Sequence, residues 1–292
     1  MLAPFQIIHP TRVSEASSEL HRLGERVKIY AGGAELLLLL RHKFLEAEYL
    51  LNIKRIHELN SIVREGPLLR IGATVTHHRL ENDALVRACL PMLAYAESQV
   101  ANIRVRNQGT LGGNLCFNDP HSDPSTALLV YEANVVIAGR RGARQMPLSD
   151  FLVGMYATAL EPDELLTEVQ VPLLPAGFGD AYLRVHNFQR PTLGVAVAAK
   201  LQDKQIAGVR LAVGCIGPKA ERLTELEGRL IEASMIEAEK IIGESKRYLT
   251  DLFQPVNDLL GSADYKLYIT QVLLRRALEQ AVQPNGGHTR VG

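Results

Sequence analysis

The fold of this chain is decided by residues 103–114, which read IRVRNQGTLGGN. The stretch ends in two adjacent glycines, Gly112 and Gly113, flanked by a threonine hydroxyl and an asparagine amide that can hydrogen-bond an anion. A glycine has no Cβ, so it lets anionic oxygens approach the backbone closely and adopts positive φ without a steric penalty. This stretch is therefore a candidate anion-binding loop.

A second glycine pair lies earlier, in the sequence Ala31-Gly32-Gly33-Ala34-Glu35. The β-branched and aromatic residues of 27–30 predict a strand before it, and the leucines of 35–44 predict a helix after it. Backbone N–H groups at the start of a helix have no partner inside the helix and lie at the positive end of its dipole. One such loop is typical of an ordinary turn, whereas two predict a site for the phosphates of a nucleotide.

Spacing excludes the common nucleotide-binding and hydrolase motifs. The sequence contains no GxGxxG, no glycine run that ends in Gly-Lys-Ser or Gly-Lys-Thr, no GxSxG and no HExxH. The adjacent pair His77-His78, predicted on a strand, would face opposite directions, so we expect these residues and His121 to be polar surface or rim residues. A nucleotide fold other than the Rossmann or Walker type is therefore predicted, with no catalytic side-chain constellation.

Charge and composition narrow the possible partners. The 32 Lys and Arg residues balance the 32 Asp and Glu residues, so we expect neither nucleic acid nor an anionic membrane as a partner. The run Leu36 to Leu40 is too short to span a bilayer and is predicted to be core, and the first residues lack an export signal, which predicts a cytoplasmic protein. Cys89, Cys116 and Cys215 are scattered, which predicts buried thiols and no metal site.

Strand and helix patterns divide the chain in two. Further strands are predicted at 50–53 and 68–71, giving a small parallel or mixed sheet, and Pro91 should start or kink a helix over 85–100. Prolines and glycines cluster at 172–179, which predicts a domain boundary. The remaining elements are predicted strands at 128–130, 134–138 and 165–171 in an antiparallel sheet, strands at 195–201 and 209–215, and helices at 221–249, broken near Gly228 and Gly243, and 264–282.

The segments Ala31-Gly32-Gly33, Ile71-Gly72-Ala73 and 103–114, followed by Asp119-Pro120 and Ser122-Asp123, closely resemble the FAD-binding medium subunits of molybdenum hydroxylases. This is the family of carbon monoxide dehydrogenase medium subunits and xanthine dehydrogenase FAD domains. The resemblance implies an α+β fold with a vanillyl-alcohol-oxidase-type FAD-binding domain of two subdomains. It also implies a smaller C-terminal α+β domain of antiparallel strands and helices. The implied bounds are 1–176, 177–284 and a loose tail at 285–292.

The resemblance also implies which residues hold FAD. The two glycine segments would bracket the pyrophosphate, Val100 would lie near the cofactor, Asp123 near the ribose and Leu166 by the isoalloxazine. Tyr182 would lie over one flavin face and Arg184 near the ring. The complete set is Ala31, Gly32, Gly33, Ala34, Glu35, Val100, Thr110, Leu111, Gly112, Gly113, Asn114, Asp123, Leu166, Tyr182 and Arg184.

Simpler roles remain open for three of these residues. Asp123 could instead cap a helix that begins at Pro124, Tyr182 could be an ordinary core residue, and Arg184 could be a solvated strand residue. The chain also departs from the family where an Asp is common, at Pro191, and where a basic residue is common, at Asn187. The chemistry of that stretch is therefore left open.

The resemblance implies a noncovalent flavoprotein subunit that carries electrons. Neither glycine segment contains the His, Cys or Tyr that a covalent flavin bond requires. The molybdenum cofactor would lie on a large partner subunit and iron–sulfur clusters on a small one, in a dimer of heterotrimers. Two alternatives remain open from the sequence: a self-sufficient flavin oxidoreductase of the same fold, and a nucleotide-binding assembly factor for a molybdenum enzyme.

Overall fold

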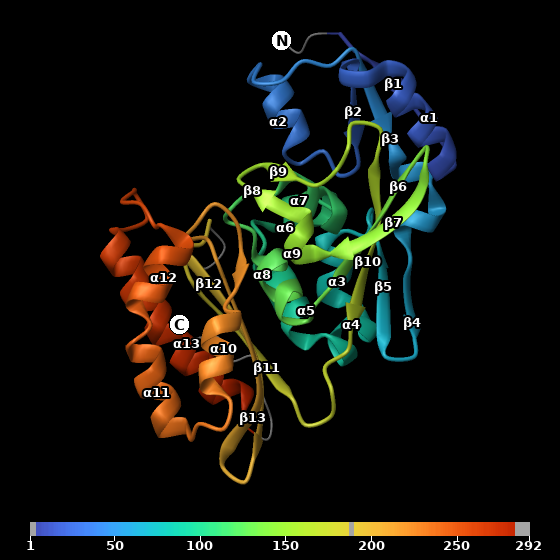
Figure 1. Cartoon of the computed structure of the whole chain (residues 1–292). Coiled ribbons are helices and arrows are strands. Elements are labelled where there is room, and N and C mark those ends of the chain that lie inside the picture. The colour runs from blue at the N-terminus through green and yellow to red at the C-terminus, as the bar shows by residue number, and fades with distance from the viewer. Residues whose placement is uncertain (1–3, 187–189, 284–292) are drawn as a thin grey trace.

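The computed structural model describes residues 4–186 and 190–283. Asn187 and the tail 285–292, for which the sequence makes predictions, lie outside the described residues. Figure 1 shows an N-terminal unit, a central unit built on a five-stranded sheet, and a C-terminal sheet whose far side is covered by helices.

The N-terminal unit is a parallel sheet of three strands in the order β1-β3-β2. The strands predicted at 27–30 and 50–53 lie in it, whereas the strand predicted at 68–71 lies in the antiparallel sheet of the central unit. Helix α1 (Val13–Leu23) buries Ala16, Leu20 and Leu23 against it, at the spacing of one helical face. Helix α2 (Leu36–Arg41) is shorter than predicted. The strands are β1 (Gln6–Ile8), β2 (Val27–Tyr30) and β3 (Tyr49–Asn52), and 3-10 turns lie at Gly24–Arg26, Ile53–Arg55 and His57–Asn60.

The central unit is an antiparallel sheet covered on one face by short helices. Its strands, in spatial order, are β4 (Ile62–Glu65), β5 (Leu68–Gly72), β10 (Leu165–Pro172), β6 (Asn134–Gly139) and β7 (Gly142–Pro147). The predicted antiparallel pairing of 134–138 with 165–171 is confirmed by the register Leu166 to Ile137. Alternate residues such as Ile71, Ile137 and Val169 are fully buried under the helices.

Besides β6 and β7, the chain between β5 and β10 forms helices and one small hairpin. They are α3 (His77–Asn82), α4 (Ala84–Cys89), α5 (Pro91–Gln99), α6 (Ile103–Gln108), α7 (Leu111–Phe117), α8 (Asp123–Val130), α9 (Leu148–Phe151), β8 (Leu152–Gly154) and β9 (Ala157–Thr158). Pro91 starts a helix, as predicted, because a proline at the first helical position loses no hydrogen bond.

Three sequence predictions are wrong, two in the central unit and one at helix α2. Residues 128–130 end helix α8, every residue of which is buried; a short apolar run cannot by its pattern distinguish a buried helix from a strand. His77 and His78 lie on helix α3, where Thr76 caps the helix. The run Leu36 to Leu40 is mostly not core: only Leu40 is buried, and Leu38 is 47% exposed.

The C-terminal unit is an antiparallel sheet with strands in sequence order. Its elements are β11 (Gly179–Val185), β12 (Leu193–Gln202), β13 (Gln205–Gly214), β14 (Glu221–Arg222), α10 (Thr224–Leu230), α11 (Met235–Gly243), α12 (Lys246–Phe253) and α13 (Ala263–Ala281). The predicted helix over 221–249 therefore begins with a short strand. It is interrupted after Leu230, near Gly228, and again after Gly243, as predicted.

Both faces of this C-terminal sheet are buried, which ties it to the central unit. Val195 and Val197 of β12 pack among helices α10 to α13, whereas Ala196 and Ala198 belong to the core that surrounds α8. A strand buried on both faces reads as a continuous apolar run, as 193–199 does. The small alanine side chains let α8 lie close to the sheet.

We expect Ala196→Leu to destabilise the chain, because Ala196 is fully buried opposite Tyr182 and has no room for three more carbons. Overpacking of this kind costs about 1–3 kcal/mol. Urea unfolding should show a lower free energy of unfolding. The matched control is Ala207→Leu, because Ala207 is exposed on the neighbouring strand β13 and its change should stay within about 0.5 kcal/mol. Equal effects from the two substitutions would contradict this account.

Candidate functional site

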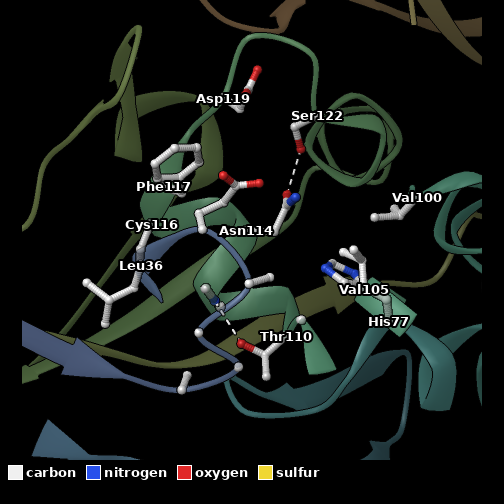
Figure 2. Close-up of a pocket in the computed structure, with 18 of the residues that line it drawn as sticks. Leu36, His77, Val100, Val105, Thr110, Asn114, Cys116, Phe117, Asp119 and Ser122 are labelled. Carbon is white, nitrogen blue, oxygen red and sulfur yellow. Dashed lines mark hydrogen bonds between the residues drawn. The ribbon is translucent and has the colours of Figure 1, made fainter. Parts of the chain in front are cut away.

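A cavity of about 590 Å³ lies where the N-terminal unit meets helices α3, α6 and α7. This volume is within the range of about 300–1,000 Å³ that is usual for small-molecule sites. Twelve of the fifteen residues predicted from sequence line the cavity, and Leu111, Tyr182 and Arg184 do not. Figure 2 shows Leu36 of α2 on the same side as Cys116 and Phe117 of α7, with His77 of α3 and Val105 of α6 on the other side.

The first glycine segment offers hydrogen-bond donors to this cavity. Gly33 has a φ of +78°, which favours glycine, and its carbonyl accepts the N–H of Leu37 at 3.1 Å as helix α2 begins. In the described part of the chain, the N–H groups of Gly32, Gly33, Ala34 and Glu35 have no acceptor within the protein. Because all four residues line the cavity, this loop presents a row of open donors.

The second glycine segment is different, because its amides are already engaged. The amide of Leu111 donates to Val75 O (3.0 Å), that of Gly112 to Ala73 O (3.0 Å), and that of Gly113 to Thr110 Oγ1 (3.1 Å). What this segment offers is a smooth backbone and the side chain of Asn114, whose Oδ1 accepts the Ser122 hydroxyl at 2.6 Å. The two segments therefore contribute different things to the site.

The glycines of the two segments also differ in what surrounds them. A Cβ on Gly32 would lie 2.2 Å from Gln108 O, and one on Gly112 would lie 2.6 Å from Ala73 Cβ, so both positions require glycine for backbone packing. A Cβ on Gly113 would meet only Thr110 Oγ1, at 2.9 Å, and otherwise face open space. Gly113 is thus the glycine whose missing side chain leaves room for a ligand.

Asp123 is the centre of a buried polar cluster at the wall of the cavity. Its Oδ1 accepts the Tyr182 hydroxyl at 2.7 Å, and its Oδ2 accepts Arg184 Nη1 at 3.0 Å. Arg184 also donates to the carbonyl of Gln99 at 2.8 Å. Burial raises the pKa of Asp123 to about 6, although the positive charge of Arg184 and the bond from Tyr182 both oppose that increase.

This cluster decides between the roles that the sequence left open for Asp123 and Arg184. Asp123 is the first residue of α8 and Ser122 is its cap residue, so the prediction that Asp123 caps the helix is wrong. Arg184 is not solvated, because its side chain is only 1% exposed. Tyr182 is likewise buried, and it stands with Arg184 behind Asp123 rather than on the cavity wall.

Several cavity residues were not predicted as site residues. Arg190 lies 3.0 Å from Asp119, and burial raises the pKa of the half-buried Glu35, while Arg190 lowers that pKa and Asp119 raises it. His77 lines the cavity and contacts Glu97. Sequence carried no signal for these pairs because their members lie 20 or more positions apart on different elements.

The described residues contain neither a metal-ligand cluster nor a membrane-spanning helix. In residues 4–186 and 190–283, no three His, Cys, Asp or Glu side chains come together in a way that could hold a metal ion. Within the same ranges, no helix is both long and apolar enough to cross a membrane.

Cys215 is buried as predicted, whereas Cys116 lines the cavity, and burial raises its thiol pKa to about 12.

Comparison with known proteins places this geometry in a family. Residues 3–174 match the family described as the FAD binding domain in molybdopterin dehydrogenase, and residues 188–281 match the CO dehydrogenase flavoprotein C-terminal domain. The carbon monoxide dehydrogenase medium chain of Hydrogenophaga pseudoflava is 34% identical, over 96% of this chain and 98% of the relative. The xanthine dehydrogenase FAD-binding subunit of Escherichia coli O157:H7 is 28% identical, over 90% and 91%.

Solved structures agree with the sequence matches. A chain of carbon monoxide dehydrogenase from Hydrogenophaga pseudoflava superposes with a TM-score of 0.91 at 32% identity, covering 96% of this chain and 98% of that chain. The resemblance inferred from the glycine segments and the α+β architecture that it implied are therefore confirmed. The chain belongs to the family of FAD-binding medium subunits of molybdenum hydroxylases, and it is an oxidoreductase flavoprotein subunit.

Proposed function

We propose that this chain holds FAD without a covalent bond and carries electrons through it, from iron–sulfur clusters on a partner subunit to an external acceptor. The observation that carries the proposal is the row of open amides from Gly32 to Glu35, which faces a cavity of ligand size. A diphosphate is the part of FAD that such a row of N–H groups at a helix start would bind.

The other cavity residues fit the remaining parts of FAD. Val100 and Leu166 are apolar wall residues suited to a flat ring, and Asn114 is suited to a hydroxyl or phosphate oxygen. Asp123 is suited to a ribose hydroxyl: each of its oxygens accepts one bond, and an ionised carboxylate has about four acceptor sites. Tyr182 and Arg184 support the cofactor indirectly, by holding Asp123 in place.

When bound, FAD supplies the redox chemistry and exchanges electrons singly with clusters and in pairs with an acceptor. The work of this chain is to bind and orient the cofactor. The thiol of Cys116 lies at the cavity, and partial burial raises its pKa to about 12, so it is protonated at neutral pH and a poor nucleophile. This supports noncovalent binding.

We propose further that the chain works in a complex. The relatives are medium chains or FAD-binding subunits of multi-subunit enzymes. The expected partners are a large subunit with the molybdenum cofactor and a small subunit with iron–sulfur clusters, in a dimer of heterotrimers. We place the domain boundary at 176/177, so that residues 1–176 hold FAD and residues 177–284 form the C-terminal domain.

The proposal is tested by reconstitution. Purified chain supplied with FAD should retain one equivalent of flavin, acid precipitation should release all of it, and the flavin should stay oxidised under anaerobic conditions without partners. Addition of reduced iron–sulfur and molybdenum subunits should bleach the flavin absorbance. Absence of bound flavin would refute the proposal. Reduction by an organic substrate in the isolated chain would indicate a self-sufficient oxidoreductase, and transient association with the partners would indicate an assembly factor.

We expect Gly113→Ala to weaken FAD binding about tenfold, which corresponds to about 1.4 kcal/mol, with a smaller effect on folding. The new methyl group would enter the cavity, and its one close contact is the Thr110 hydroxyl. Gly112→Ala is the matched comparison, because its Cβ would collide with Ala73 and should mainly lower the free energy of unfolding. Flavin fluorescence titration and urea unfolding of both variants measure the two effects. Equal losses in both variants would contradict the division between them.

We expect the free energy of unfolding to fall as pH rises from about 4 to about 6, in part because of Asp123. The unfolded carboxyl, with a pKa near 3.8, releases its proton before the folded one, whose pKa is about 6. The contribution of protonated Asp123 to the free energy of unfolding is therefore lost across this window, and this loss is at most about 3 kcal/mol. In urea unfolding at several pH values, the free energy of unfolding should change less with pH in Asp123→Asn than in wild type. An identical pH slope in the two proteins would contradict the raised pKa.

A further inference from the structure

A buried histidine–carboxylate pair stands at the cavity without a role in the account above. His77 on α3 and Glu97 on α5 are 3% and 0% exposed, and His77 Nδ1 lies 2.5 Å from Glu97 Oε2. The other carboxylate oxygen, Oε1, is buried with no hydrogen-bond partner among the described residues. Among the described residues, the Glu97 carboxylate therefore hydrogen-bonds only with the His77 ring, which fixes the ring in place.

The free edge of the imidazole borders the cavity. Nδ1 is occupied by Glu97, yet His77 lines the cavity, so the edge that carries Nε2 is the one available there. The hydrogen bonds of the described residues give Nε2 no protein partner. A Cβ on Gly109, itself a cavity residue, would lie 3.2 Å from Nε2. Figure 2 shows His77 beside Val105, on the same side of the cavity as Val100.

Gly109 connects His77 to the open amides. The His77 N–H donates to Gly109 O at 3.1 Å, and a Cβ on Gly32 would lie 2.8 Å from Gly109 Cα. His77 and the Gly32 loop therefore both lie against Gly109. An anion bound to the amides of Gly32 to Glu35 would lie near the carboxyl groups of Glu35 and Asp119 as well as the guanidinium of Arg190, so a further hydrogen-bond donor favours its binding.

We propose that His77, held at Nδ1 by Glu97, donates Nε2–H to a phosphate oxygen of the FAD diphosphate. His77 would be a cofactor-binding residue, and Glu97 a positioning residue that fixes the orientation of the ring. The inference rests on the proposed function, because it requires FAD in this cavity. It adds a side-chain donor to a site whose other proposed diphosphate donors are backbone amides.

The test compares FAD binding by wild type, His77→Gln, Glu97→Gln and the double variant. The double variant removes the buried charge altogether and leaves two amides that can bond to each other, so it guards against a folding defect. We expect His77→Gln and the double variant to weaken binding about 10-fold to 100-fold, the range of one charge-assisted hydrogen bond, and Glu97→Gln to weaken it less. The phosphorus NMR spectrum of bound FAD should shift in all three, with the flavin absorption spectrum unchanged.

His78→Gln is the matched control, because His78 is the next residue, has a 45% exposed side chain and does not line the cavity. It should bind FAD as wild type does. Unchanged affinity and an unchanged phosphorus spectrum in His77→Gln and the double variant would overturn the inference while leaving the proposed function intact. A changed flavin spectrum with an unchanged phosphorus spectrum would overturn it too, by moving the contact to the ring. Failure of wild type to bind FAD would instead refute the proposed function.

Discussion

The site depends on one close backbone contact, between Gly32 and the carbonyl of Gln108. A Cβ at Gly32 would lie 2.2 Å from that oxygen, so any other residue would push the two segments apart. This contact joins the loop between β2 and α2 to the end of α6. The cavity forms where they meet. The chain's two glycine segments are thus parts of one interface, and the cavity is the space left beside it.

Helix α8 connects the cavity with the C-terminal unit. It is buried along its whole length, between α5 on one side and strands β12 and β13 on the other. Its first residue, Asp123, reaches the cavity wall and is held from behind by Tyr182 and Arg184 of β11. The C-terminal sheet therefore helps to position a cavity residue although it lines little of the cavity itself. Under the proposed function, this gives the C-terminal domain a role in cofactor binding without direct contact.

The sequence predicted the parts of this arrangement that depend on local chemistry. The parallel strands, the helix start at Pro91 and the antiparallel pairing of β6 with β10 all follow from residue pattern, and all were confirmed. The family resemblance, carried by motifs at 31–33 and 103–114, supplied the rest of the fold. The errors arose where tertiary burial overrides pattern. Residues 128–130 have strand composition but end a helix enclosed on every side.

The same distinction explains why part of the site escaped prediction. Glycine spacing identifies a loop that can bind an anion, but it cannot say whether the amides of that loop are free. That depends on acceptors elsewhere: Ala73 and Val75 occupy the amides of Gly112 and Leu111, whereas nothing in the described residues occupies those of Gly32 to Glu35. Charge partners are set in the same way, because Arg184 becomes the partner of Asp123 only when β11 packs against α8. Two loops that look alike in sequence thus differ in function because of their neighbours: one supplies donors and the other supplies shape.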